Sequence, residues 1–274
     1  MTGGDIPLIM GVVNVTPDSF SDGGRWLDPD RAVAHGMELA AQGADLLDVG
    51  GESTRPGAKR PPIDVELSRV LPVVTALARA GMTVSVDTMR AEVAQACLQA
   101  GAEVVNDVSG GLADPRMSAL VAEAGVPFVA MHWRAHSAQM DRLADYADVL
   151  AEVVTELGER VEALVVAGVA REQIILDPGF GFSKEAHHNW QLLAGLPSVV
   201  ALGHRVLVGT SRKRFLGGFA EHRVEPAPAA ERDAATAATS LLAAQAGAWA
   251  VRVHDVPSTR DALAVWKRVR DAGR

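Results

Sequence analysis

Cysteine is nearly absent from this chain of 274 residues. The single cysteine, Cys97, excludes an internal disulfide and any zinc or iron–sulfur site that needs several thiolates. The sequence also lacks an apolar run of about 18 residues, and no basic segment precedes a long apolar one at its start. We therefore expect a cytoplasmic protein without a membrane span or a secretory leader.

Positive charge is also scarce. Asp and Glu number 34 against 26 Lys and Arg, which gives a formal net charge of −8. An acidic chain without a long basic run is a poor candidate for binding nucleic acid or an anionic membrane surface. Lysine is rare, with four residues against 22 arginines. A lysine inside a motif, such as Lys213 in GTSRKRF, is therefore a candidate for a specific role in neutralising charge.

Hydrophobic residues make up 48% of the chain, and they follow one repeating unit. Short β-branched apolar runs alternate with longer stretches of helical character, which Gly often closes. The runs predict eight strands, at residues 8–15, 45–50, 83–87, 103–108, 127–131, 173–177, 205–209 and 248–253. The longer stretches predict eight helices, at residues 30–43, 64–81, 90–101, 115–125, 147–168, 188–202, 230–247 and 257–273.

Strict alternation of strand and helix predicts a parallel sheet with crossover helices. The strands are apolar throughout, as expected when both faces of the sheet are covered. Eight units in about 250 residues match the size of a (β/α)8 barrel. An open doubly wound sheet is the alternative, but the turn NVTPDSFSDGG after the first strand lacks the G-x-G-x-x-G that usually marks that fold. We predict a single-domain (β/α)8 TIM barrel over residues 1–274.

Polar groups lie at or just beyond the ends of all eight predicted strands, which is the end of a barrel where chemistry is placed. In chain order they are Asn14, Asp48 with Glu52, Asp87, Asn106 with Asp107, His132, Asp177, Ser211 to Lys213, and Arg252 with His254. Turn and capping roles account for Asp107. They account less well for Asp87 and Asp177, because a carboxylate that ends an apolar strand is costly without a partner. We therefore predict functional roles for these two carboxylates.

These polar groups divide into two sets of opposite character. Three accept hydrogen bonds and suit the N–H-rich edge of a pterin or purine: Asp87, Asn106 and Asp177. Four donate, at the corner where such barrels usually bind phosphate: Ser211, Lys213, Arg252 and His254. In DPGFGF, two glycines permit a tight turn from which Phe182 can cover a flat ring. The residues thus predict a phosphorylated heterocycle as ligand, with a Schiff base at Lys213 as an alternative.

At this point the chain resembles the dihydropteroate synthases, the folate-pathway enzymes that sulfonamide drugs inhibit. Eight segments carry the resemblance: MGVVNVTPDSFSDGG (10–24), DVGGESTRPGA (48–58), VSVDTMR (84–90), VVNDVSGG (104–111), AMHW (130–133), LDPGFGFSK (176–184), VGTSRKRFLG (208–217) and VRVHDV (251–256). They span nearly the whole chain in family order and at family-like spacing. The resemblance is strong because eight separate motifs agree.

The resemblance implies a barrel that condenses 6-hydroxymethyl-7,8-dihydropterin pyrophosphate with p-aminobenzoate, with sulfonamides as competing ligands and a homodimer as the expected assembly. The pterin would be held by Asp87, Asn106, Asp177 and Lys213. The pyrophosphate would be held by Arg252, His254 and Asn14, the last through Mg²⁺, which prefers oxygen donors and substrate phosphates. The p-aminobenzoate site would include Thr54, Pro56, Phe20, Phe182 and Ser211, and Arg55 is a further substrate-binding candidate.

The expected catalytic residues are Asp87, Lys213, Asn14, Arg252 and His254. The hypothesis is that pyrophosphate leaves first and that Asp87 stabilises the resulting pterin methylene cation. Two alternatives stay open beside the synthase. One is a pterin-binding module like the methyltetrahydrofolate-binding barrels of corrinoid methyl transfer, and the other is a paralogue that binds pterin without turnover.

Overall fold

A closed barrel of eight parallel strands forms the centre of the molecule, in the order β1 to β8 with β8 paired to β1. It is seen in a computed structural model that describes residues 6–16, 28–53, 58, 60–135, 143–219 and 225–273. The strands are β1 Leu8–Asn14, β2 Leu46–Gly50, β3 Val84–Asp87, β4 Val104–Asp107, β5 Phe128–Met131, β6 Ile174–Asp177, β7 Arg205–Val208 and β8 Ala250–Val253. Each lies within a predicted strand, so the predicted (β/α)8 barrel is confirmed.

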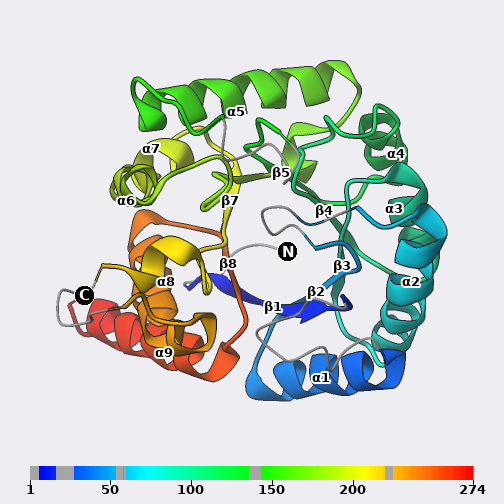
Figure 1. Cartoon of the computed structure of the whole chain (residues 1–274), viewed down its shortest axis with the longest axis horizontal. Helices are drawn as coiled ribbons and strands as arrows, with labels where there is room; N and C mark the ends of the chain where they lie inside the picture. The colour runs from blue at the N-terminus through cyan, green and yellow to red at the C-terminus, as the bar shows by residue number, and fades with distance from the viewer. Residues whose placement is uncertain are drawn as a thin grey trace.

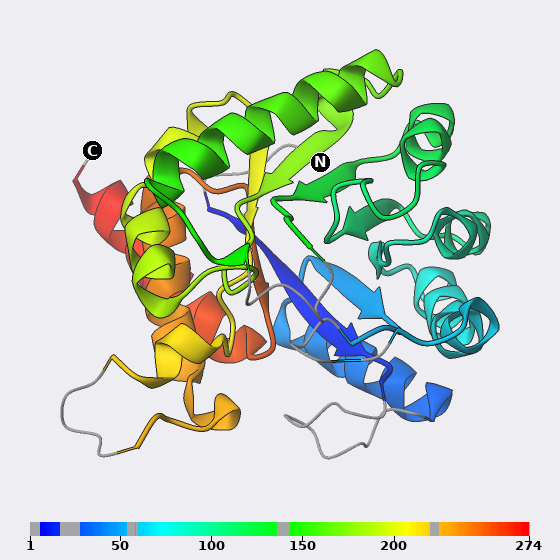
Figure 2. The same ribbon diagram turned by 45° about the horizontal axis from the view of Figure 1, so that its top comes forward.

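Helices surround the barrel on all sides (Figures 1 and 2). They are α1 Pro29–Gln42, α2 Ile63–Arg79, α3 Ala91–Gln99, α4 Met117–Ala124, α5 Val149–Val166, α6 Ala186–Ala194, α7 Leu196–Val200, α8 Asp233–Ala246 and α9 Val256–Ala272. One prediction is wrong: residues 188–202 form two helices instead of one. Gly195 ends α6, and Pro197, in the first turn of α7, has no N–H to continue the ladder of the preceding helix.

Side chains of successive strand residues point alternately into the barrel and out toward the helices. The outward set packs with the helices in one large hydrophobic core, which includes the buried Cys97. The inward set forms a separate apolar layer: Met10, Leu46, Val104, Val129, Ile175, Leu207, Trp249 and Ala250. This layer fills the interior, and apart from Ser85 of β3 the buried inward polar side chains lie nearer the carboxyl ends of the strands.

Figures 1 and 2 together show that the carboxyl end of β1 faces the viewer in Figure 1. That end is where the sequence predicts the chemistry. Within the described ranges, no helix has the length and apolar character needed to cross a bilayer.

Candidate active site

Arg252 lies at the centre of the polar groups inside the barrel mouth. Its Nε donates to Asp48 Oδ2 at 2.6 Å, and its Nη2 donates to Asp87 Oδ2 at 2.9 Å. The amide of Asn106 donates to the same Asp48 oxygen at 3.0 Å. Strands β2, β3, β4 and β8 thus contribute one side chain each to a continuous network. The two bonds of Arg252 use two of its five N–H groups, so the guanidinium retains capacity to meet a phosphate.

Asp48 is the member of this network to which sequence reasoning assigned no role. It lies two residues before the end of β2, so it shares the inward face with Leu46 and Gly50. Asp48 is fully buried, and its second carboxylate oxygen, Oδ1, has no hydrogen-bond partner among the described residues. The signal was present in the sequence: a carboxylate at an inward position of an apolar strand needs a buried cation.

Asp87 ends β3 beside this network. Burial raises the pKa of Asp87 to about 7, the nearby Asp48 carboxylate adds to the rise, and Arg252 opposes it. The carboxyl group therefore gains or loses its proton near neutral pH. A group with this property at a barrel mouth is suited to respond to charge that develops on a ligand.

The turn after β6 brings Asp177, Phe182 and Lys213 together. Asp177 Oδ1 accepts a hydrogen bond of 2.7 Å from the N–H of Gly179, and burial raises the pKa of Asp177 while Lys213 opposes the rise. The ammonium of Lys213 lies 4.0 Å from the centre of the Phe182 ring. Burial lowers the pKa of Lys213 to about 8, Arg252 adds to the fall, and Asp177 and Asp87 oppose it. Lys213 therefore sits between the two carboxylates and against an aromatic face.

Ser211 and His254 form the donor side of the mouth. Ser211 Oγ lies 2.9 Å from Nδ1 of His254 and accepts the backbone N–H of His254 at 3.1 Å. The residue after Ser211, Arg212, has a left-handed backbone with φ of 58°, and its guanidinium forms a two-point ion pair with Asp233 at the start of α8. This pairing holds the turn from which Ser211 and Lys213 project.

His132, one of the polar groups at the ends of the predicted strands, pairs with residues outside this network. Its two ring nitrogens contact Lys184 and Glu156 at 3.0 and 2.8 Å, and its side chain is almost fully buried. Burial lowers the pKa of His132 to about 4, and the charge of Lys184 adds to the fall. His132 is therefore a neutral structural residue behind the mouth.

Asn14 ends β1 and pairs in register with Gly50, which in turn pairs with Asp87, so the amide belongs to the same mouth. Among the described residues, no three His, Cys, Asp or Glu side chains are grouped to hold a metal ion. Four of the predicted substrate-binding residues lie outside the described residues: Phe20, Thr54, Arg55 and Pro56.

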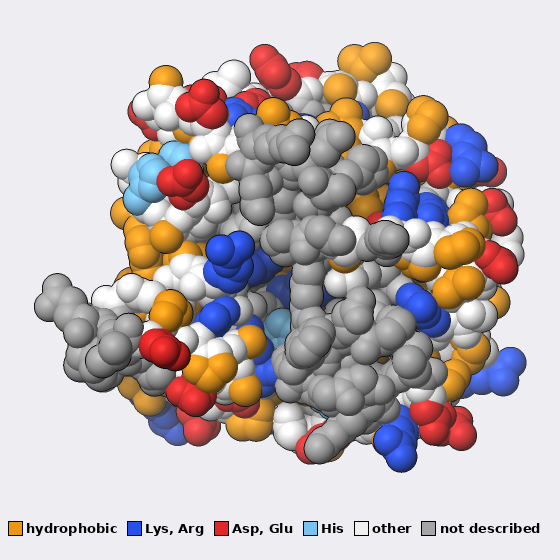
Figure 3. All heavy atoms as spheres, viewed as in Figure 1, with side chains coloured by type: hydrophobic (Ala, Val, Ile, Leu, Met, Phe, Trp, Pro, Cys, Tyr) orange, Lys and Arg blue, Asp and Glu red, His pale blue; other side chains and the backbone are white. Residues whose placement is uncertain are grey.

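The molecular surface at the carboxyl ends of the strands carries charge of the sign that an anionic ligand needs. In Figure 3, Lys and Arg side chains and a histidine lie around the centre of the visible surface, whereas acidic side chains lie mostly toward the rim. The acidic chain therefore presents local positive charge where the strands end. Such focusing favours an anionic ligand despite the net charge of −8.

Comparison with known proteins shows to which family the chain belongs. Residues 10–254 match the pterin binding enzyme family. The dihydropteroate synthase of Mycobacterium leprae (strain TN) is 56% identical over 261 residues, covering 94% of this chain and 91% of the relative. The chain belongs to the dihydropteroate synthases of the pterin binding enzyme family.

Solved structures agree with this assignment. The Xanthomonas albilineans dihydropteroate synthase with 4-aminobenzoic acid has a TM-score of 0.88 and 47% identity, covering 97% of this chain and 94% of that one. The same enzyme with 7,8-dihydropteroate has a TM-score of 0.86 and 44% identity, covering 98% and 95%. The Yersinia pestis enzyme with a sulfonamide drug has a TM-score of 0.92 and 38% identity, covering 97% and 95%. The family assignment makes the chain a transferase and confirms the resemblance seen in its motifs.

Proposed function

We propose that this chain condenses 6-hydroxymethyl-7,8-dihydropterin pyrophosphate with p-aminobenzoate, giving 7,8-dihydropteroate and pyrophosphate. One observation carries the proposal for this molecule: hydrogen-bond acceptors and donors face each other across a single barrel mouth. The acceptors are carboxylates and an amide from β3, β4 and β6, and the donors lie within β8 or just after β7 and β8. A flat N–H-rich ring bearing a pyrophosphate is complementary to both sides at once.

The pterin ring is proposed to lie on the acceptor side. Its N–H groups would donate to Asp87, Asn106 and Asp177, whose carboxyl and amide groups are buried or nearly so and therefore strong partners. Lys213 would approach the opposite edge of the ring, and Phe182 would cover its face. Each of these assignments is a prediction that binding measurements on variants test.

The first chemical step is departure of the leaving group. The bond between the pterin methylene carbon and the pyrophosphate oxygen breaks, and the electron pair leaves with the oxygen. Arg252 and His254 would stabilise the negative charge that grows on the pyrophosphate, because groups already oriented by Asp48 and Ser211 need no reorganisation. The positive charge left on the methylene group would be stabilised by the carboxylate of Asp87.

The second step forms the new bond. The aniline nitrogen of p-aminobenzoate is a weak nucleophile, so it attacks once the cation exists and then loses one proton. Water would capture the same cation, and its exclusion is the proposed role of the segments 16–24 and 52–60. Sulfonamides would compete for the p-aminobenzoate position.

Mg²⁺ is the proposed cofactor, with Asn14 as its ligand from the protein. The donor set fits this ion: a single neutral amide oxygen binds a hard cation weakly, and substrate phosphates complete the shell. When bound, Mg²⁺ would supply positive charge to the leaving pyrophosphate. Asn14 would orient the substrate through it at the end of β1.

We further propose a cytoplasmic homodimer. Support for the dimer comes from α8 and α9. The two helices pack against each other, and their outer faces expose Leu242, Val265 and Val269. Apolar side chains grouped on adjacent helices often mark a contact between protein molecules. Sedimentation velocity of the wild-type protein and of a Val265→Lys/Val269→Lys double variant tests this. A sedimentation coefficient that is the same for both would refute the assignment of this face.

The activity itself is tested by pyrophosphate release from dihydropterin pyrophosphate and Mg²⁺, with and without p-aminobenzoate. Release that depends on p-aminobenzoate, with dihydropteroate as product, supports the synthase. Pterin binding without turnover supports the inactive paralogue or the binding module. Covalent trapping at Lys213 by borohydride would support the Schiff-base alternative.

A further inference from the structure

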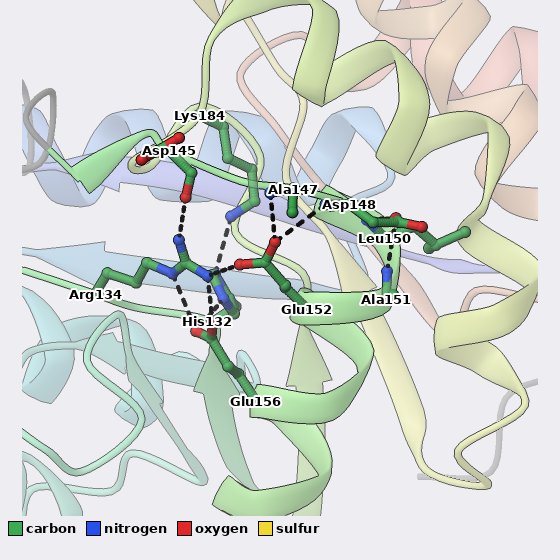
Figure 4. Close-up of polar contacts among 10 residues, drawn as sticks. All are labelled: His132, Arg134, Asp145, Ala147, Asp148, Leu150, Ala151, Glu152, Glu156 and Lys184. Atoms are coloured by element: carbon green, nitrogen blue, oxygen red, sulfur yellow. Dashed lines mark hydrogen bonds and ion pairs between the residues drawn. The ribbon is translucent and has the colours of Figure 1, made fainter.

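A second polar cluster lies behind the proposed pterin site, between the ends of β5 and β6 and the start of α5 (Figure 4). Its members are His132, Arg134, Glu152, Glu156 and Lys184. None of them has a role in the proposed chemistry. Hydrogen bonds and ion pairs nevertheless link each member to the next, and Lys184 is the member nearest to the site.

Lys184 is buried, and its ammonium makes three contacts. Nζ lies 3.0 Å from Nδ1 of His132, 3.1 Å from the carbonyl oxygen of Gly179 and 3.2 Å from that of Phe182. An ammonium carries three N–H donors, and three acceptors surround this one. A neutral amine has only two donors, so the charged form is the one this geometry satisfies.

A series of hydrogen-bonded side chains behind Lys184 fixes that arrangement. For His132 Nδ1 to accept, its proton must lie on Nε2, which points at Glu156 Oε2 at 2.8 Å. Glu156 is held in turn by Arg134, which also binds Glu152 at 2.7 Å. The hydrogen bond from His132 lowers the pKa of Glu156 to about 2. The imidazole of His132 therefore stays neutral between the ammonium of Lys184 and the carboxylate of Glu156, in the tautomer that carries its proton on Nε2.

The loop that Lys184 holds is the one that shapes the pterin site. It runs from Asp177 through Gly179 to Phe182, and the N–H of Gly179 orients Asp177 while Phe182 lies against Lys213. Gly179 has φ of 71°, and a Cβ there would lie 2.5 Å from the carbonyl oxygen of His132. The loop thus packs directly against the residue that follows β5, and Lys184 holds it by hydrogen bonds to two of its carbonyl groups.

We propose that Lys184 is a positioning residue for the pterin site: its ammonium, held by His132 and two loop carbonyl groups, fixes the turn that carries Asp177 and Phe182. Its charge also favours the ionised form of Asp177 without contacting the ligand. The inference rests on the proposed function, because it takes Asp177 and Phe182 to be pterin-binding residues.

The charge of Lys184 is adjustable near neutral pH. Burial lowers the pKa of Lys184 to about 7, and Asp177 opposes the fall. The charged and titratable groups that interact with it come from several neighbouring elements. They are Asp177 from β6, His132 and Arg134 after β5, Tyr146 ahead of α5, Glu156 from α5, His188 from α6, and Lys213 after β7. When the ammonium loses its proton, one of the three contacts that hold the turn is lost.

The test measures the Kd of dihydropterin pyrophosphate by calorimetry for wild type and Lys184→Met across a pH series. Near pH 6.5 the variant is expected to bind at least about tenfold more weakly, the usual scale for losing hydrogen bonds to a charged group. At higher pH the ratio of the two Kd values should fall, because wild-type Lys184 then loses its charge and one of its three contacts. It should stay above one, because a neutral amine still has two donors for the two loop carbonyl groups. Lys213 titrates in both proteins and cancels from the ratio.

A side chain that only filled space would give a ratio independent of pH, and that result, or a ratio of one throughout, would overturn the proposal. Lys267→Met, at an exposed lysine of α9, is the matched control and should bind like wild type. Glu156→Gln serves if Lys184→Met does not fold, because the Glu156 side chain is 35% exposed. It should weaken binding about threefold by loosening the His132 tautomer, against no change in the exposed control Glu159→Gln. A wild-type protein that fails to bind this pterin refutes the proposed function itself.

Discussion

Replacement of Asp87 by Asn separates binding from chemistry at the barrel mouth. The amide keeps the size of the side chain and an oxygen that can accept from the pterin or from Arg252, whose Nη2 lies 2.9 Å from Asp87 Oδ2. What it removes is the negative charge. If that charge stabilises the methylene cation, the loss should appear mainly in kcat.

The size of the loss follows from electrostatics. Unit charges about 5 Å apart attract by about 3 kcal/mol at an effective dielectric constant of about 20. Since about 1.4 kcal/mol corresponds to a tenfold change in rate, the full charge is worth about 100-fold to 300-fold in kcat. Arg252 shares the same carboxylate, so we expect a loss near the lower end, with the Kd of the pterin raised only about threefold.

The assay is steady-state release of pyrophosphate, with pterin Kd measured separately by calorimetry. Burial raises the pKa of Asp87 to about 7, so the wild-type rate should fall as the pH drops below about 7 and the carboxylate takes up a proton. Asp87→Asn should lack this acidic limb, and Asp64→Asn, at an exposed residue of α2, should retain it. Equal losses in kcat and in pterin affinity would refute the cation-stabilising role.

Three further predictions address the rest of the mouth. Asp48→Asn removes one carboxylate from Arg252, which keeps Asp87, and should destabilise the fold by about 3 kcal/mol, measured by urea unfolding; an unchanged midpoint would contradict the buried ion pair. Gly179→Ala would place a Cβ 2.5 Å from a carbonyl oxygen and should abolish pterin binding, whereas Gly203→Ala, which has similar φ but open space, should lower Tm only. Chelation of Mg²⁺ should stop turnover reversibly, and Asn14→Ala should raise the Mg²⁺ concentration needed for half-maximal rate, so a rate indifferent to EDTA would remove Asn14 from this role.

The alternation of apolar runs with helical stretches, and the turn residues between them, were sufficient to predict the barrel. All eight strands were predicted because each is a short apolar run bounded by turn residues, and parallel strands buried on both faces need no finer pattern. The helix predicted over residues 188–202 was the exception. Its apolar content continues through the break, and Gly195 and Pro197 end one helix and begin another within it.

The site was predictable only as far as it depends on strand ends. Asp87, Asn106 and Asp177 stand where their strands stop, so topology alone brings them to one mouth. Asp48 was noted but given no role, because it lies two residues before the end of its strand, although the alternation of the strand places it inside. The contact of Lys184 with His132 joins residues 52 apart and depends on how the turn after β6 folds back over β5, which no local pattern specifies.

The ion pairs of Arg252 span most of the chain: 204 residues separate it from Asp48, and 165 separate it from Asp87. During synthesis the two carboxylates emerge first, and their shared cation arrives with the last strand. Until β8 closes the barrel, these two inward carboxylates lack that cation, so water must remain around them. The polar mouth and the closure of the barrel are therefore acquired in the same late event. A chain shortened before β8 should expose both carboxylates to solvent, and we expect it to bind no pterin at all.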